Sequence, residues 1–420
     1  MHDDPPSGTA TAAAGRLTQD LASVAEARAA LLAGLVRLGS ESVGLGLALG
    51  RILAEDVLAG TDLPGTDNSS MDGYAVAARD VVRATVEAPV TLQIGGESRA
   101  GAPPSAHLPG TATIIATGAP LPCGADAVVP VEQTRRAASA VTILAPATAG
   151  DFVRRRGEDA PAGTVLARTG DRLRSVDIGV CAAAGRGQVN VARRPRVALI
   201  STGDELVAPG TPPLPHQVTD INGAMLSAAV SEAGGIPIVV GVIRDDAQAT
   251  TRALEEASAA ADLIVSSAGV SMGGHDHVRE CVAALGSVDL WKVAMRPGKP
   301  LVIGRVGTTP FIGLPGNPVS SAVTFLLFAR PAILALQGAT QLLPAAFPVV
   351  LAESFAKPAS LEMFVRVRLH TEGDSLVAVS SGGQGSGMMR ALGDADGLAI
   401  LPAGVGNVPA GATVQAIALP

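Results

Sequence analysis

The strongest constraint on this fold is the alternation of short apolar runs with helical patterns between residues 196 and 337. The strand-like runs are Arg196–Ser201, Ile236–Ile243, Leu263–Ser266, Val288–Val293, Leu301–Ile303 and Phe311–Leu314, and the helical runs are Asn222–Ala233, Ala247–Ala261, His275–Leu285 and Val319–Gln337. Parallel strands need crossover connections, and these place helices on both faces of a sheet. We therefore predict a multi-domain α/β fold whose central sheet is mostly parallel.

The parts of the chain that flank this region have a different pattern, with short β-like runs between Gly and Pro turns. A helical pattern over Thr18–Arg37 precedes them, and Ser23 and Glu26 have the spacing of a capping box. The predicted parts are a disordered N-terminus (1–15), an N-terminal part (16–192) with a β-rich insertion at about 60–150, a central α/β domain (193–338) and a C-terminal β-rich domain (339–420).

Composition excludes several classes of protein. The formal net charge is −7 and only 2% of residues are aromatic, which argues against nucleic-acid binding by a basic or ring-rich surface. The three cysteines are far apart and indicate reduced thiols rather than disulfides. The apolar stretch Ala322–Leu336 contains Arg330 and Pro331, and the N-terminus lacks the apolar core of a signal peptide. We expect a cytoplasmic protein with no membrane contact.

Polar or Gly-rich loops follow several of the predicted strands. They are Thr202–Glu205, Ser267–Gly274 and Pro315–Pro318, and the last two lead into helices. In an open parallel sheet, ligands bind beyond the carboxyl ends of the strands, and helix N-termini favour phosphate groups. Ordinary turn chemistry is the alternative for any single loop. A Gly-x-Gly-x-x-Gly motif is absent, and Pro300 follows Gly298-Lys299, so neither common nucleotide motif is present.

Charged residues gather near the same loops. The chain has three Lys and 28 Arg, and Lys299 lies close to Arg296, which points to anion binding, although a solvated surface Lys remains the alternative. Carboxylates at Asp204, Glu205, Asp245, Asp246 and Asp276 suit Mg²⁺ beside a phosphate, with helix capping as the simpler interpretation. His275 and His277 lack an evident third zinc ligand, which favours a capping role.

A series of long motifs then becomes recognisable. They are Asp67–Val76 (DNSSMDGYAV), Thr117–Pro122 (TGAPLP), Gly124–Val129 (GADAVV), Arg156–Asp159 (RGED), Ser201–Leu206 (STGDEL), Arg296–Pro300 (RPGKP) and Gly313–Ser320 (GLPGNPVS). In this order they resemble the molybdopterin molybdenumtransferase family, which includes the C-terminal part of gephyrin. The resemblance runs from about Ala14 to the C-terminus.

The resemblance implies a fold, an assembly and a reaction. The central part would be similar to the molybdopterin adenylyltransferase fold, and the C-terminal part would be β-barrel-like. The family forms elongated homodimers whose site lies between the central part of one subunit and the N-terminal insertion of the other. The implied reaction uses molybdate and adenylylated molybdopterin, transfers molybdenum to the dithiolene sulfurs and releases AMP with Mg²⁺. A molybdopterin adenylyltransferase is a possible protein partner.

Roles are carried over only where a residue matches a family motif. Glu205 and Asp276 would hold Mg²⁺, with Asp245 and Lys299 among the catalytic residues. The residues implied to bind substrate or anion are Ser267, Gly269, Ser271, Arg296, Lys299, Pro315, Gly316, Asn317, Pro318, Ser320, Arg366 and Ser386. The residues implied to close the site from the partner subunit are Asp67, Asp72, Thr117 and Asp159.

Three positions depart from the family's usual pattern. Ala268 stands where a second Gly follows the Ser, Gly274 where an acidic residue is common, and Ile221 where a Ser is common. Alanine disfavours the positive φ angles that Gly adopts freely. Beside the transferase reaction, these departures leave two alternatives: a paralogue that acts as a cofactor-binding scaffold and a tungsten-selective homologue. Adenylyl transfer by the central part alone is a separate alternative, and the N-terminal and C-terminal motifs argue against it.

Overall fold

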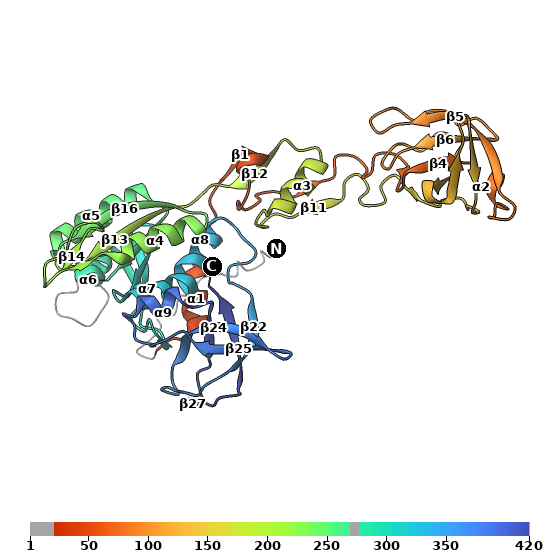
Figure 1. Ribbon diagram of the computed structural model, residues 1–420. Helices are drawn as coiled ribbons and strands as arrows, with labels where there is room; N and C mark the ends of the chain where they lie inside the picture. Colours follow the sequence, from red (N-terminus) through yellow and green to blue (C-terminus); the bar gives the residue numbers. More distant parts are fainter. Residues whose placement is uncertain (1–20, 269–276, 420) are drawn as a thin grey trace, which may run out of the picture.

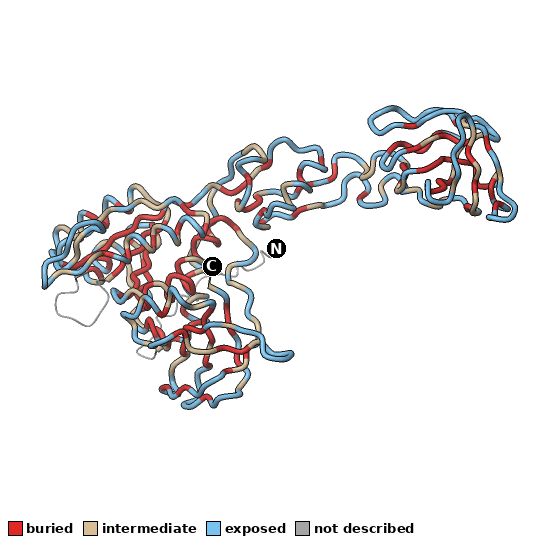
Figure 2. Tube along the Cα trace, viewed as in Figure 1, coloured by how far each residue is buried: buried red, intermediate tan, exposed pale blue. Residues whose placement is uncertain are grey.

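The computed structural model describes residues 21–268 and 277–419 and shows an elongated molecule (Figure 1). A β-rich distal module lies at one end, and the central α/β sheet and a C-terminal barrel lie together at the other. A narrow connecting segment joins the two ends. Buried residues form separate cores in these parts, including a small one within the connecting segment (Figure 2).

The central sheet has the strand order β16-β13-β17-β21-β20-β18. Its strands are β13 (Arg196–Thr202), β16 (Ile236–Ile243), β17 (Leu263–Ser267), β18 (Gly286–Trp291), β20 (Val302–Val306) and β21 (Thr309–Leu314). The first four strands in the sheet order are parallel, which confirms the mostly parallel sheet. Gly307 and Thr308 join β20 to β21 in a tight hairpin, so β20 is antiparallel to its neighbours.

Helices cover both faces of this sheet, as the alternating pattern predicts. They are α4 (Ile221–Glu232), α5 (Ala247–Ala260), α6 (His277–Leu285), α7 (Pro318–Thr324), η3 (Phe325–Ala329) and α8 (Arg330–Leu336). Leu226 and Val323, from α4 and α7, belong to the core on one face, and Leu254 and Val282, from α5 and α6, belong to the core on the other. The loops between strands and helices therefore lie at the edges of a rigid layer.

The segments α7, η3 and α8 form one continuous helix over Pro318–Leu336. The η3 segment is π-helical and precedes Pro331, which lacks an N–H and whose ring would collide with the carbonyl four residues earlier in a regular helix. The helix is long and apolar enough to cross a membrane, but 83% of its apolar window is buried within the fold. It is thus placed as the core helix of the central domain.

The C-terminal part closes into a β-barrel, as expected. Its strands are β22 (Ala346–Leu351), β24 (Glu362–Glu372), β25 (Ser375–Ser380), β26 (Gly397–Leu401) and β28 (Thr413–Ala418), with α9 (Met389–Gly393) and the short pair β23 (Phe355–Ala356) and β27 (Asn407–Val408) beside them. The sheet closes because β24 pairs with both β25 and β26. The strand β19 (Met295–Arg296) of the central domain also pairs with β24, which fixes the barrel to the central sheet.

The N-terminal part supplies a helix, the connecting segment and the distal module. The helix is α1 (Val24–Ala33); the connecting segment has β1 (Ser40–Gly44), η1 (Leu45–Leu47), β2 (Val57–Leu58), β11 (Val165–Ala167), α3 (Ser175–Ala183) and β12 (Gln188–Ala192). The distal module has β3 (Asn68–Ser69), β4 (Gly73–Val76), α2 (Ala78–Val81), β5 (Val90–Ser98), β6 (Thr111–Ile115), β7 (Ala127–Pro130), η2 (Val131–Gln133), β8 (Thr134–Arg136), β9 (Ala140–Ile143) and β10 (Val153–Arg154).

The predicted capping box is present at the start of α1. The Glu26 N–H donates to Ser23 Oγ at 3.2 Å, and the Ser23 N–H donates to Glu26 Oε2 at 2.9 Å. The helix ends at Ala33 rather than at the predicted Arg37, because Gly34 takes the C-cap position.

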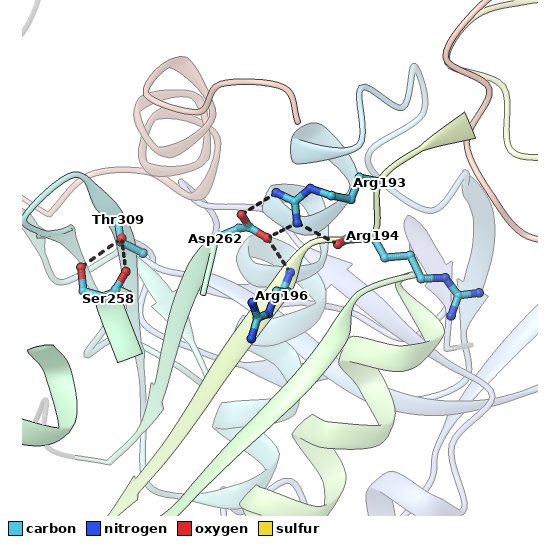
Figure 3. A network of polar contacts seen from close by, with 6 residues as sticks. All are labelled: Arg193, Arg194, Arg196, Ser258, Asp262 and Thr309. Atoms are coloured by element: carbon cyan, nitrogen blue, oxygen red, sulfur yellow. Dashed lines mark hydrogen bonds and ion pairs between the residues drawn. The ribbon is translucent and has the colours of Figure 1, made fainter. Parts of the chain in front are cut away.

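An ion pair fastens the connecting segment to the central sheet where β12 leads into β13. Figure 3 shows Arg193 donating to both carboxylate oxygens of Asp262, at 2.7 and 3.0 Å, while the Arg196 N–H donates to the same carboxylate at 2.7 Å. Burial raises the pKa of Asp262, but the bonds from Arg193 and Arg196 outweigh it and hold that pKa below its ordinary value. The connecting segment and the distal module together form an arm, and this ion pair sets where the arm leaves the central domain.

Candidate active site

A cavity of about 560 Å³ lies where β13, β17 and β21 end. Six residues predicted from the sequence line it: Glu205, Ser267, Pro315, Gly316, Asn317 and Pro318. They come from three separate loops, and the parallel directions of the three strands bring those loops to one edge of the sheet. The structure thus places the three polar loops around a single pocket.

Asn222, near the start of α4, links two of these loops. Its Nδ2 donates to Ser267 Oγ at 2.7 Å and to the Gly316 carbonyl oxygen at 2.8 Å. The preceding Asp220 caps α4 by accepting from the Gly223 N–H at 2.9 Å. Asn222 was not among the predicted site residues. The N-cap Asp220 is the sequence signal that could have identified it, because a helix that begins there places Asn222 on its first turn, facing the sheet edge.

The start of α7 connects the pocket to the barrel. Asn317 is the N-cap and Pro318 the first helical residue, a position where its missing N–H leaves no bond unmade. The next N–H, that of Val319, donates to the Ser386 carbonyl oxygen at 3.1 Å. Ser386 therefore reaches the predicted anion loop through its backbone, and Ser320 is buried behind that loop at 4% exposure.

Arg366 lies in the barrel strand β24 and is fully buried. Its Nη2 donates to the carbonyl oxygens of Gly383 and Gly385 at 2.7 and 3.1 Å, while Nε and Nη1 have no partner among the described residues. Burial lowers the pKa of the guanidinium. The same loop is fastened to Arg366 by the Gln384 side chain, which bonds both the N–H and the carbonyl of Arg366 at 3.0 Å. A buried cation with two free donors is suited to an anion.

Arg296 and Lys299 are exposed on the segment between β18 and β20, whose strand β19 pairs with the barrel strand β24. Gly298 between them has a φ of +104°, and a Cβ there would lie 2.4 Å from Thr324 Cγ2 on α7. Only glycine fits this position, so the backbone must turn tightly against the core helix and leave Lys299 on the surface. Neither cation forms an ion pair with a described carboxylate.

Acidic residues surround the loop that follows β13. Glu205 lines the pocket, and the Asp245 N–H lies 3.4 Å from Asp204 Oδ1. Asp276 lies outside the described residues, and no group of three metal-ligating side chains occurs among those that are described. Glu205 has no hydrogen-bond or ion-pair partner among the described side chains, so its carboxylate oxygens fit a hard cation such as Mg²⁺.

The remaining predicted residues lie in or beside the distal module. Thr117 donates to Asp72 Oδ1 from both its N–H, at 2.6 Å, and its hydroxyl, at 2.8 Å, and these bonds lower the pKa of Asp72. The Arg156 N–H and Arg155 Nη1 donate to Asp67 at 2.8 and 2.7 Å. Asp159 is exposed nearby, with its N–H bonded to the Leu63 carbonyl. This group lies at the opposite end of the elongated molecule from the pocket (Figure 1).

Comparisons with known proteins cover nearly the whole chain. Residues 22–185 match the MoeA N-terminal region (domains I and II), residues 198–335 a probable molybdopterin binding domain, and residues 348–419 the MoeA C-terminal region (domain IV). A molybdopterin molybdenumtransferase 2 of Mycobacterium tuberculosis H37Rv is 39% identical over 381 residues, 89% of this chain and 94% of that protein. The chain belongs to the molybdopterin molybdenumtransferase (MoeA) family.

Further relatives agree with this assignment. A molybdopterin molybdenumtransferase of Nostoc sp. PCC 7120 is 39% identical over 388 residues, 91% of this chain and 89% of that protein. The structure of a molybdopterin biosynthesis MoeA protein from Pyrococcus horikoshii OT3 aligns with a TM-score of 0.83 at 26% identity and covers 95% of this chain and 100% of that one. The MoeA fold therefore extends over the arm, the central domain and the barrel.

One chain of this MoeA-family protein gathers its predicted site residues in two places. The central pocket and the adjoining barrel loop hold one set, and the distal module holds Asp67, Asp72, Thr117 and Asp159. Gly269, Ser271 and Asp276 lie outside the described residues, as does Gly274. Asp245 is exposed, and its N–H lies 3.4 Å from Asp204 Oδ1.

Two of the three departures from the family pattern can be placed. Ala268 adopts a φ of +78°, so the alanine occupies the left-handed conformation that its side chain disfavours. Its N–H donates to the Leu314 carbonyl at 3.1 Å, and the residue lines the pocket. Ile221 is the first residue of α4, is 41% exposed and also lines the pocket. Both departures change the surface that a ligand would contact.

Proposed function

We propose that this protein transfers molybdenum from molybdate to adenylylated molybdopterin and releases AMP, with Mg²⁺ as the metal cofactor, in the cytoplasm. The observation that carries the proposal is the buried Arg366 of β24, which keeps two nitrogens without a partner among the described residues while its Nη2 bonds the loop whose Ser386 carbonyl accepts from the start of α7. An oxyanion bound by Arg366 would therefore lie beside a pocket whose loops suit phosphate and pterin. Two anions can be held side by side there, as the reaction requires.

In this proposal the cationic residues bind the anionic substrates and an acidic residue binds the metal ion. The donors of Arg366 would bind molybdate oxygens, and the exposed cations Arg296 and Lys299 would draw both anions toward the boundary between barrel and pocket. The loops at Ser267 and Gly316 would hold the pterin phosphate. Glu205 would hold Mg²⁺, which when bound shields the charge of the phosphoanhydride and its leaving group. Donors fixed before the reaction stabilise charge that develops during it.

We also propose that the site is completed by a second copy of the chain. Asp67, Asp72, Thr117 and Asp159 lie at the far end of the arm, and the Arg193–Asp262 pair fixes the direction in which the arm leaves its own central domain. These residues cannot reach the pocket of the same chain in this arrangement. In a homodimer, the distal module of one subunit would instead face the pocket of the other.

The experiment is AMP release from adenylylated molybdopterin by the purified protein with Mg²⁺, using molybdate and tungstate in parallel. Release above background with molybdate supports the proposal, and none with either oxyanion refutes it. Shared sites are tested at subsaturating molybdate by mixing Arg366→Met subunits, which should keep little activity there, with Asp72→Asn subunits, in which the distal half of the site is altered. A hybrid dimer has one site with both wild-type halves, so activity should return; a mixture that stays inactive contradicts the shared site.

A further inference from the structure

Asn222 joins two loops of the pocket through one side chain. Its Nδ2 is within hydrogen-bond distance of Ser267 Oγ, at the end of β17, and of the Gly316 carbonyl oxygen, after β21. A carbonyl can only accept, so the nitrogen side of the amide must face Gly316, and this fixes the orientation of the group. Both donors of a side chain on a third element, α4, are therefore used to connect the loops.

The same two loops are also in steric contact. A Cβ placed on Gly316 would lie 3.1 Å from the Ala268 Cβ, tighter than an ordinary carbon–carbon contact. The Ala268 N–H donates to the Leu314 carbonyl at 3.1 Å, which ties the two loops a second time. The loops therefore already lie close together, and the two bonds of Asn222 oppose their separation.

Fold stability alone does not account for Asn222. The residue is 7% exposed, and its Oδ1 is buried without a partner among the described residues. A buried acceptor that lacks a donor destabilises the folded state, and an apolar side chain of similar size would avoid this. A side chain that leaves one buried acceptor unmet while fixing two ligand-facing loops is typical of a site held ready for its ligand.

We propose that Asn222 is a positioning residue that sets the spacing of the Ser267 and Gly316 loops before the substrate binds. The proposal rests on the proposed function for the identity of the substrate. Asn222 acts through the two loops and not by contact with the reacting atoms. Loops that are already ordered bind without the entropy cost of ordering them, and this favours the bound ground state and transition state equally.

The test is Asn222→Leu, which keeps the side-chain size and removes the two donors. The KM for adenylylated molybdopterin should rise about tenfold while kcat stays within about twofold, because uniform binding is lost. Amide hydrogen exchange at Ala268, Gly316 and Asn317 should accelerate in the ligand-free protein.

Gln337→Met is the matched control. Gln337 is also buried, at 4% exposure, and its Nε2 also bridges two carbonyls, those of Ala233 and Ile333, at 3.0 Å each. It lies at the opposite end of the same long helix from Pro318 and does not line the pocket. This variant should keep the wild-type KM and the wild-type exchange rates at the pocket loops.

Each result decides the proposal. A wild-type KM in Asn222→Leu overturns it, as does an equal rise in KM in Gln337→Met. A raised KM with unchanged exchange at the loops also overturns it, because Asn222 would then contact the substrate instead of positioning the loops. If the wild-type protein releases no AMP, the proposed function fails, and the exchange rates alone decide whether Asn222 holds the two loops.

Discussion

Replacing Arg366 by Met should raise the stability of the protein while weakening molybdate binding. Arg366 is fully buried, has no carboxylate partner among the described residues, and leaves Nε and Nη1 unbonded. Methionine fills a similar volume with apolar atoms. The bonds from Gln384 to the Arg366 backbone do not involve the side chain and should persist.

The expected gain follows from these contacts. Each buried donor without a partner costs about 1–3 kcal/mol of folding free energy, so removing two gains about 2–6 kcal/mol. The two Nη2 bonds that are lost come from a charged group and contribute about 1.5–3 kcal/mol each, and the carbonyls of Gly383 and Gly385 belong to exposed residues that water can reach. Removing the unpaired buried charge also relieves a desolvation penalty of several kcal/mol, so the expected net increase in the free energy of unfolding is about 2 kcal/mol.

The loss of binding has the opposite sign. Hydrogen bonds to a charged group contribute about 1.5–3 kcal/mol, which corresponds to a roughly 10- to 100-fold weaker affinity for molybdate. Urea unfolding and calorimetric titration with molybdate measure the two effects. Arg368→Met, at an exposed arginine two residues along the same strand, is the control and should change neither. A less stable Arg366→Met protein with wild-type molybdate affinity would refute the reasoning.

Three further changes have defined outcomes. Glu205→Gln should raise the Mg²⁺ concentration for half-maximal AMP release about tenfold, because a neutral amide binds a hard cation weakly; an unaltered Mg²⁺ titration removes Glu205 from the metal site. Lys299→Ala should raise the KM for molybdate several-fold (about 3- to 10-fold) without lowering the unfolding midpoint, since Lys299 is exposed, and unchanged kinetics contradict its role. The hydrogen bonds from Thr117 lower the pKa of Asp72 from 3.8 in the folded protein. Ionised Asp72 therefore stabilises the folded distal module above pH 3.8, and this contribution is lost as the pH falls through the pKa of Asp72 in the folded state. Asp72→Asn should therefore be more sensitive to pulse proteolysis than the wild type at pH 7, with the difference disappearing in acid; a constant difference down to pH 2 contradicts this.

Much of the central domain could be predicted because its signals are local. The apolar runs and helical periods from 196 to 337 imply a mostly parallel sheet, and that arrangement requires the loops after β13, β17 and β21 to meet. The direction of strand β20, which is antiparallel to its neighbours, could not be predicted in this way. Its direction depends on the tight hairpin at Gly307 and Thr308, which periodicity does not reveal.

Other parts of the site depend on contacts between segments distant in sequence. No local pattern indicates that Gln384 and the Gly383–Gly385 backbone would enclose Arg366, and its role came only from the family resemblance. The link from Asn222 to Ser267 and Gly316 spans 45 and 94 residues along the chain. Such hydrogen bonds are decided by how the elements pack, and a single sequence does not encode packing in any local spacing.

A net charge of −7 is compatible with anionic substrates once the charges are sorted by their partners. Several acidic groups are neutralised along the arm and its junction, as in the pairs Arg155–Asp67, Arg156–Asp62 and Arg193–Asp262. Among the described residues, Lys299, Arg296 and Arg366 form no such pair, and all three lie where the central domain meets the barrel. Since an unpaired cation attracts an anion far more strongly than a neutralised one, these three cations suit the proposed anion site. Neutralising Lys299 should therefore affect molybdate capture more than neutralising Arg155, although both changes alter the net charge equally.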